Sequence, residues 1–190
     1  MKPRTPFNWL PVAEQPRAFV VLLVATIATM VAEQITGAPL KTDPAPSGIV
    51  SFELAGALPV AQKIIESWGA TGRVYAGLNL GLDFLFIAAY ASCISLGCVL
   101  VARSFARQSA LFANLGIVLA WAMWLAALFD CTENYALINL LLGSQQAAFA
   151  VIAQWCAIPK FLIVGLGIAY VVLGAVAAMI AKPRGAASAA

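Results

Sequence analysis

Residues 128–142, LFDCTENYALINLLL, place two carboxylates and an amide between two strongly apolar runs. Asp130, Glu133 and Asn134 follow the spacing i, i+3, i+4, so they share one face of a helix. The apolar residues on both sides extend that helix beyond its polar group. A chain that avoids charge almost everywhere therefore collects charge at one level of a long apolar helix.

The composition of the whole chain explains the apolar surroundings of this stretch. Hydrophobic residues make up 63% of the 190 residues and charged residues 10%, whereas an average soluble domain is about 45–50% apolar and about 25% charged. One soluble core cannot take up this excess, so part of the solvent must be lipid. The net charge of +3 is small and the basic residues are scattered, which argues against nucleic acid as a partner.

Four apolar segments are candidates for membrane spans, because a bilayer core about 30 Å thick requires about 20 helical residues. The sequence predicts an all-α fold, in which residues 1–190 form a single membrane domain with an up-and-down bundle of four transmembrane helices. The predicted spans are 18–37, 74–102, 109–142 with an outer extension, and 146–181. Residues 1–17 form a cytoplasmic segment, 38–73 an outer connection and 182–190 a disordered tail.

The first span has a second interpretation, because a basic start and a short apolar run are also typical of a cleaved signal peptide. Orientation follows from lysine and arginine, which cluster at the N-terminus, between the second and third spans, and at the C-terminus. These residues are Lys2, Arg4, Arg17, Arg103, Arg107, Lys182 and Arg184. The positive-inside rule places both termini in the cytoplasm. We expect an integral membrane protein, with a bacterial inner membrane as its location.

The outer connection contains a proline-rich linker and then an amphipathic helix. Pro59 suits the first helical position and Gly69 the end of the helix after Trp68. The apolar stripe of this helix fits either a membrane surface or the protein itself. The third and fourth spans continue past the bilayer and need cover. The sequence therefore predicts a short amphipathic helical cap on the outer side.

Charged residues of separate spans fall at a common height. Counting from the cytoplasmic basic residues at 1.5 Å per residue puts Asp83, Asp130 and Lys160 roughly 30–35 Å away, and Glu33 a little deeper. A lone lysine in the membrane interior is costly, so Lys160 is expected to have a carboxylate partner, either Asp83 or Asp130. The sequence predicts a mixed-charge layer between the cap and the membrane.

The candidate ligand-binding residues are those of the layer, two side chains that share the face of Asp83, and a glutamate of the cap. They are Glu33, Glu53, Asn79, Asp83, Tyr90, Asp130, Glu133, Asn134 and Lys160. Each has a plain structural interpretation as well. The acidic group of the third span can mark its exit from the bilayer, Lys160 can extend to the headgroups, and Glu53 can cap its helix.

The chain contains no histidine, which excludes histidine-ligated haem, histidine metal sites and Ser-His or Cys-His nucleophile pairs. We expect no cofactor and no metal. Cys131 and Cys156 are level with each other if the hairpin between the last two spans is centred near Gly143–Ser144. A disulfide between them is compatible with an oxidising face, although equal height need not bring the thiols into contact.

Three functions remain open, and the first is favoured. The protein binds a small amphipathic molecule or a lipid at the polar layer. Alternatively, it is a non-catalytic accessory or structural subunit, which packs on a membrane-protein partner or on a second copy through the small residues Gly165, Gly167, Ala169 and Gly174. A third hypothesis is an acid–base enzyme that uses Asp83 and Glu133. The lipid bilayer is a partner under all three.

The blocks IVSFELAG, AQKIIESWG, LGLDFLFIAAYA and LFDCTENYAL resemble an uncharacterised family of small four-helix bacterial membrane proteins, over residues 48–142. This resemblance implies a four-helix membrane fold and no known activity. The layout is also loosely similar to the emopamil-binding/sterol-isomerase group. That group's histidine is missing here and no motif matches residue by residue, so no functional residue is carried over.

Overall fold

The computed structural model describes residues 5–181, and the part of the chain that it describes contains helices and no β-strand. The elements are α1 (Gln15–Gly37), the 3-10 turn η1 (Ala38–Leu40), α2 (Ile49–Glu53), α3 (Leu58–Phe105), α4 (Ala110–Leu141) and α5 (Ala147–Ala181). The predicted all-α class is confirmed. The predicted disordered tail at 182–190 lies outside the described residues, as do Lys2 and Arg4.

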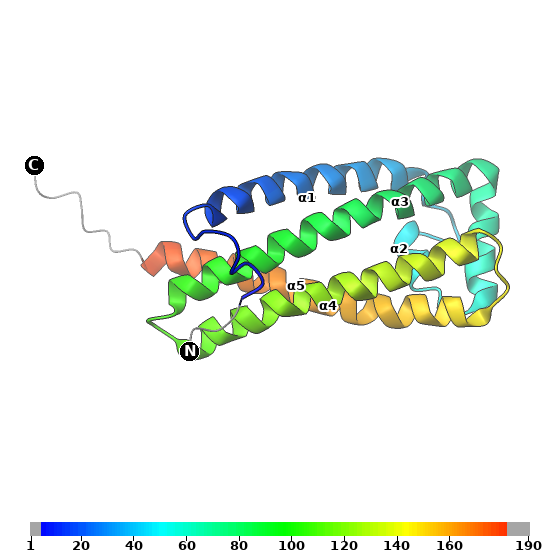
Figure 1. Cartoon of the computed structure of the whole chain (residues 1–190). Coiled ribbons are helices and arrows are strands. Elements are labelled where there is room, and N and C mark those ends of the chain that lie inside the picture. Colours follow the sequence, from blue (N-terminus) through cyan, green and yellow to red (C-terminus); the bar gives the residue numbers. More distant parts are fainter. Residues whose placement is uncertain (1–4, 182–190) are drawn as a thin grey trace, which may run out of the picture.

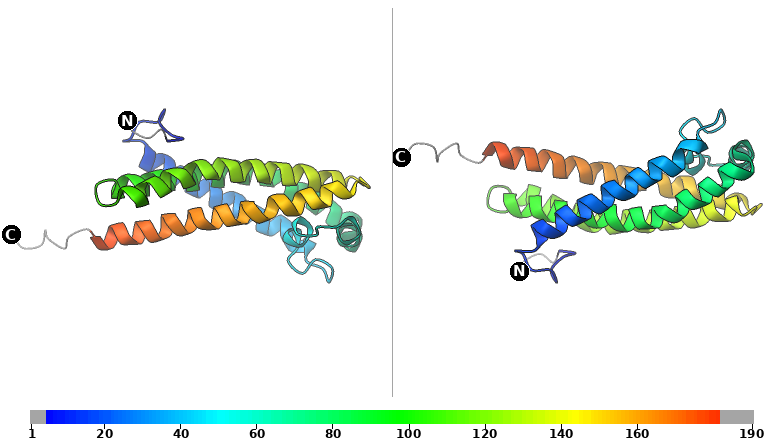
Figure 2. Two further views of the ribbon diagram at one scale, coloured as in Figure 1. Left: turned by 90° about the horizontal axis from the view of Figure 1, so that it is seen from below. Right: turned by 90° about the horizontal axis from the view of Figure 1, so that it is seen from above.

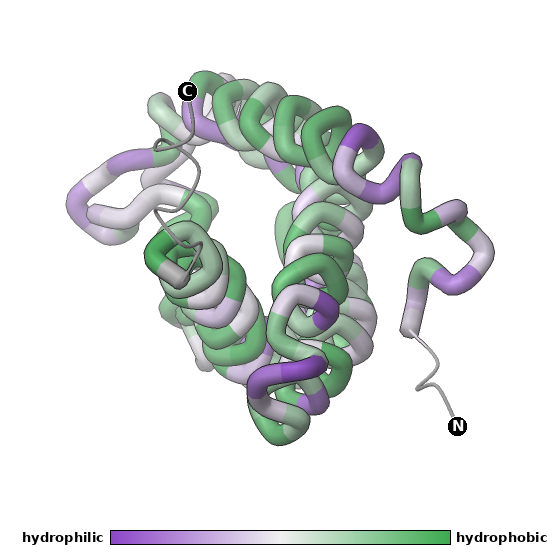
Figure 3. The backbone as a smooth tube through the Cα atoms, turned by 90° about the vertical axis from the view of Figure 1, so that its left-hand side faces the viewer, coloured by the Kyte–Doolittle hydropathy of each residue, from purple (hydrophilic) through white to green (hydrophobic). Residues whose placement is uncertain are grey.

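The four long helices lie side by side in one elongated bundle (Figures 1 and 2). Each of α1, α3, α4 and α5 is long and apolar enough to cross a membrane. The most apolar stretch of α1 has no residue buried inside the protein. The backbone is mostly hydrophobic in all four long helices (Figure 3). Apolar surface of this extent requires a lipid environment, so this is an integral membrane protein with four candidate spans.

The two ends of the bundle differ. The start of α1, the turn between α3 and α4 and the end of α5 lie at one end, here called the terminal end (Figure 1). The opposite end, called the cap end, carries α2, the α4–α5 turn and the first three turns of α3. Helix α3 contacts all three other long helices, whereas α1 packs mainly on α3.

The amphipathic helix and the second span, predicted as separate segments, are one element with a sharp bend. Helix α3 runs from Leu58 to Phe105 and departs from helical geometry at Gly69, where φ is 59° and ψ is −165°. This backbone region is open almost only to glycine, so Gly69 ends the short helix as predicted. The helix begins at Leu58, so Pro59 is its second residue, one position later than predicted. The bend turns residues 58–68 across the cap end (Figure 1).

The cap packs on the protein itself. The ring nitrogen of Trp68 donates to the carbonyl oxygen of Leu40 at 2.8 Å, and Phe52 meets Trp68 edge to face with ring centroids 5.2 Å apart. One apolar cluster joins residues of the linker, α2 and α3 to the far ends of α4 and α5; it includes Leu40, Phe52, Ile64, Trp68, Leu137, Leu140 and Ala150. The apolar stripe of the amphipathic helix 58–68 thus packs on the protein and not on the membrane surface.

The terminal end has a polar anchor of its own. The buried side chain of Gln15 donates to the carbonyl oxygen of Leu10 at 3.0 Å and accepts from Arg103 at 2.8 Å. Phe7 is buried in the apolar cluster beneath it, while Trp9 is 76% exposed. Residues 7–10 are therefore held against the start of α1 and the end of α3.

Candidate functional site

Lys160 of α5 occupies the centre of a buried ionic cluster. Its Nζ lies 2.8 Å from Oε2 of Glu133, 2.9 Å from Oδ1 of Asp130 and 3.8 Å from Oε2 of Glu53. The lysine is 6% exposed and Glu133 is fully buried. The expectation that Lys160 finds a carboxylate partner is confirmed, and the partner among the two candidates is Asp130.

Three elements position these four side chains. Asp130 and Glu133 stand at i and i+3 on α4, so both project toward the same side of α5. Lys160 comes from the facing stretch of α5, directly after Pro159. Glu53 is the last residue of α2 and is 9% exposed. The short cap helix thus reaches the same ammonium group as the membrane spans.

Hydrogen bonds extend the cluster to the remaining helices. The hydroxyl of Tyr90 donates to Oδ2 of Asp130 at 2.7 Å, and the amide of Asn134 donates to Oδ2 of Asp83 at 2.6 Å. Both bonds tie α3 to α4. The face of α4 that carries Asp130 and Asn134 therefore holds partners on α3 as well as on α5.

Asn79 joins α3 to α1 by hydrogen bonds. Its amide donates to the carbonyl oxygen of Glu33 at 3.0 Å and to the hydroxyl of Thr36 at 2.8 Å. Thr36 was not among the predicted residues, although its position three residues after Glu33 places both on one face of the first span. The nine predicted site residues thus occupy a band of the bundle that extends along α3 from Asn79 to Tyr90, a distance of about 16 Å. Together with Thr36 they are called the polar network below.

The polar network contains more acid than base. It has five carboxyl groups, those of Glu33, Glu53, Asp83, Asp130 and Glu133, and one ammonium group, that of Lys160, which contacts three of them. Oε1 of Glu33 and Oε1 of Glu133 are buried without a hydrogen-bond donor among the described residues, and Oε2 of Glu53 has only the ammonium of Lys160 at 3.8 Å. Buried like charges at close range cannot all be ionised, so the network as a whole must hold protons.

Asp83 and Glu133 have different partners. Asp83 accepts from Asn134, while Glu133 contacts Lys160. The geometry therefore gives the hypothesis of an Asp83–Glu133 acid–base pair no direct support. No group of three or more cysteine, aspartate or glutamate side chains in residues 5–181 is arranged to hold a metal ion.

Two expectations about packing require correction. Cys131 and Cys156 are free thiols, so the disulfide considered for them is absent; Cys131 packs in an apolar cluster with Ile87 and Tyr90 of α3. Equal height on two helices did not bring the thiols together. The glycine face of α5 is used inside the chain in part, because a Cβ at Gly167 would lie 2.8 Å from Ile94 and from Met123, whereas a Cβ at Gly165 would meet nothing within 4 Å. Gly174 faces Val101.

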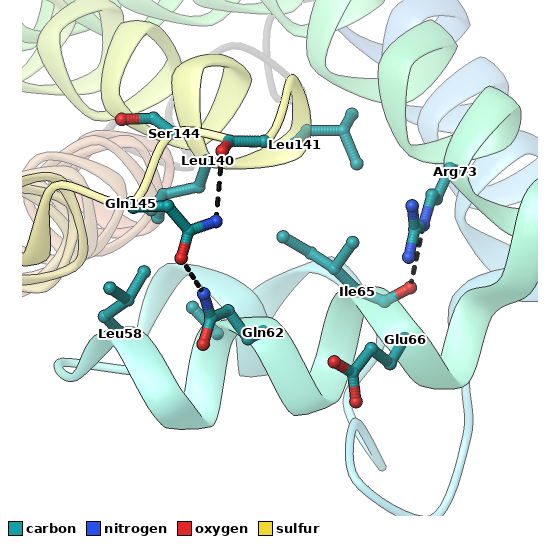
Figure 4. Close-up of a pocket in the computed structure, with 11 residues that line it drawn as sticks. Leu58, Gln62, Ile65, Glu66, Arg73, Leu140, Leu141, Ser144 and Gln145 are labelled. Carbon is teal, nitrogen blue, oxygen red and sulfur yellow. Dashed lines mark hydrogen bonds between the residues drawn. The ribbon is translucent and has the colours of Figure 1, made fainter.

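A cavity of about 240 Å³ lies at the cap end, farther along α4 than the polar network. Its walls come from the first turns of α3 and from the α4–α5 turn (Figure 4). Leu58, Ile65 and Leu140 supply apolar surface, and Gln62 donates to Gln145 across the cavity at 2.6 Å. None of the nine predicted site residues lines this cavity.

Sequence reasoning missed this cavity because its two walls are 83 residues apart along the chain at the Gln62–Gln145 contact. No motif marks either wall, and only the bend at Gly69 brings them together. Comparison of the chain with protein-family models, with curated proteins and with solved structures finds no match, so any functional assignment must come from the site itself.

Proposed function

We propose that this membrane protein binds a small amphipathic molecule or a single lipid chain in the cavity at the cap end. The observation that carries the proposal is the cavity of about 240 Å³, whose lining combines leucine, isoleucine and alanine side chains with an equal number of amide, hydroxyl and charged side chains. Ligand sites combine apolar walls with placed polar groups, and the large polar share of this lining suits a ligand with a polar head. The volume lies below the range of about 300–1,000 Å³ typical of drug-sized ligands, which favours a small or slender molecule.

Arg73 gives the ligand a polar end. Its Nε donates to the carbonyl oxygen of Ile65 at 3.2 Å, and the rest of its guanidinium borders the cavity (Figure 4). A guanidinium recognises carboxylate or phosphate through paired N–H groups. Glu66 and Gln145 border the same cavity. We therefore propose an amphiphile with an acidic head, whose apolar part lies against Leu58 and Leu140.

The polar network holds together the helices whose ends form the walls of this cavity. Its contacts join the four spans and α2, and the apolar cluster around Leu137 lies between the ion pairs of Lys160 and the cavity. In this proposal the network fixes the separation of the helix ends that form the cavity walls. The cap end then faces outward from a bacterial inner membrane, with both termini cytoplasmic, as the positive-inside rule suggests.

Native mass spectrometry of the protein purified in mild detergent tests the proposal. We expect the wild type to retain a small molecule, and Ser144→Trp, which fills the cavity from the α4–α5 turn, to lose it. Gln146→Trp adds the same side chain two positions later, outside the cavity lining, and should retain the ligand. A bare wild-type particle, or equal retention by both variants, would overturn the proposal.

Defined probes test the acidic head. Octanoate should raise the melting temperature of the wild type more than octanol does, because only the carboxylate can pair with a guanidinium. Arg73→Gln should remove the difference between the two probes while leaving the effect of octanol unchanged. An identical response of wild type and Arg73→Gln to octanoate would contradict the role given to Arg73.

A subunit role is the second candidate, and the exposed apolar face of α1 favours it. None of the most apolar part of α1 is buried inside the chain, so this face is available to lipid or to a partner helix. Under this alternative the same native spectra contain a second protein, or a second copy of this chain, at fixed stoichiometry. The inward-facing glycines Gly167 and Gly174 of α5 do not contribute to such a surface.

A further inference from the structure

Two neighbouring side chains of helix α2 enter the bundle, in addition to the contact of Ile49 with the apolar cluster and the hydrogen bond from Gln154 to the carbonyl oxygen of Leu54. It has only five residues, Ile49–Glu53, and backbone hydrogen bonds alone cannot keep so short a helix folded. Phe52 is buried in the apolar cluster of the cap, and Glu53 enters the polar network. The attachment of α2 therefore depends on how the carboxyl group of Glu53 is accommodated.

The carboxyl groups of Glu53 and Glu133 meet at one ammonium group. Nζ of Lys160 lies 2.8 Å from Oε2 of Glu133 and 3.8 Å from Oε2 of Glu53. Glu133 is fully buried, and its Oε1 has neither an ion pair nor a hydrogen-bond donor among the described residues. Oε2 of Glu53 also lacks a donor there. A buried acceptor without a donor costs about 1–3 kcal/mol, and more when it is charged.

A single proton can supply the hydrogen bond that the buried oxygens of Glu53 and Glu133 lack. A protonated carboxyl group donates its O–H, so one proton between two carboxyl groups satisfies an oxygen on each of them. Two carboxylates that share a site cannot both ionise, and such pairs commonly hold one proton in common. The same proton removes one of the excess negative charges around Lys160. The two carboxyl groups are neighbours, because Oε2 of each lies within 4 Å of the same Nζ atom of Lys160.

We propose that Glu53 and Glu133 form a proton-binding site, and that the proton shared by the two carboxyl groups fastens the cap helix α2 to span α4. The site is distinct from the cavity at the cap end, which neither residue lines. The inference does not depend on whether that cavity binds a ligand. Loss of the proton leaves two buried carboxylates facing each other, and α2 then separates from the bundle.

Charged groups around Glu53 shift its pKa in opposite directions. Glu133 and Asp130 of α4 and Lys160 of α5 face it directly, and Asp83 of α3 and Glu33 of α1 add negative charge farther away. Removal from water raises the pKa of Glu53 above its ordinary value of 4.5, Lys160 opposes this rise and Asp130 adds to it. A raised pKa means that the stabilisation is complete below about pH 4.5 and is lost as pH rises through the pKa of the folded state.

Hydrogen exchange measured by mass spectrometry tests the site in the full-length protein in detergent. In the wild type, the amides of residues 49–57 should be protected near pH 5 and should exchange at least about tenfold faster, relative to the intrinsic rate, near pH 9. Glu53→Gln should keep its protection at both pH values, because the amide donates a hydrogen bond as the protonated carboxyl does. Asp43→Asn, an equivalent change on the exposed linker, should behave like the wild type.

Infrared spectroscopy gives an independent measurement on the unaltered chain. Protonated carboxyl groups should give a carbonyl band in the wild type near pH 7, and one component of that band should be lost in both Glu53→Gln and Glu133→Gln while the component from the other carboxyl groups of the polar network remains. A wild type without that band contradicts the proposal, even if a variant fails to fold. Protection of residues 49–57 that does not depend on pH, or that Glu53→Gln loses as the wild type does, would overturn it as well.

Discussion

Lys160 determines whether the polar network can exist at all. It is the cation that three buried carboxyl groups contact, and it comes from a helix whose surface is otherwise apolar. A buried charge that loses its partner is far more costly than an ion pair is favourable. Of the side chains in the network, Lys160 is therefore expected to contribute most to its stability.

Replacing Lys160 with methionine should destabilise the protein by about 3–5 kcal/mol, because it leaves Asp130 and Glu133 buried without a cation. Denaturation in mixed detergent micelles, followed by circular dichroism, measures the change. Lys160→Arg retains the charge and should cost clearly less. Equal unfolding free energies for Lys160→Met and Lys160→Arg would mean that Asp130 and Glu133 are protonated and do not require a cation.

Tyr90 offers a smaller test of the same network. Tyr90→Phe removes the hydroxyl that donates to Asp130 at 2.7 Å and should cost about 1.5–3 kcal/mol, as expected for a hydrogen bond to a charged group. Tyr135→Phe is the matched control, since Tyr135 is largely exposed. Equal unfolding free energies for the two variants would show that Asp130 finds another donor.

At the scale of the elements, the bend in α3 creates the cap. Gly69 adopts φ 59° and ψ −165°, and a Cβ placed there would touch nothing within 4 Å. Gly69→Ala should therefore destabilise by about 1–3 kcal/mol through backbone strain alone. Gly81→Ala also meets open space, but in a helical backbone, and should be neutral or stabilising by up to about 1 kcal/mol. Thermal unfolding in detergent compares the pair, and equal shifts in melting temperature would mean that the bend tolerates a side chain.

The elements also show how far the sequence alone could predict this structure. The long apolar runs and the spacing at Asp130, Glu133 and Asn134 were sufficient to predict the bundle and the shared face, because both depend on local periodicity. The rotation of one helix against another depends on long-range packing. For that reason the pairing of Asp83 with Asn134, the separate thiols and the inward-facing glycines of α5 could not be predicted. The cavity depends on the same long-range packing.

At the scale of the whole molecule, the bundle has two chemically different ends. The terminal end carries Arg103 and the α3–α4 turn, and the cap end carries the cavity and the cap. A molecule with such ends occupies a membrane in one direction if the basic residues control its insertion. Single cysteines placed at the two ends of a cysteine-free chain can report this direction.

In intact bacterial cells, a membrane-impermeant maleimide should label Gln146→Cys in the α4–α5 turn, and it should label Gln108→Cys in the α3–α4 turn only after the inner membrane is permeabilised. Both positions are exposed, so accessibility does not depend on packing. The reverse pattern would place the termini outside, and labelling of both positions in intact cells would indicate mixed insertion.

The position of Glu53 has a consequence for biosynthesis. Its partners Glu133 and Lys160 lie 80 and 107 residues later in the chain, so they are made only after α2 has left the ribosome. Because chains fold progressively as they are made, residues 49–57 must wait, with their carboxyl group in water, until the last two helices have entered the bilayer. We expect docking of α2 to be the final step of maturation, and a nascent chain that lacks α5 to leave this segment open to proteolysis.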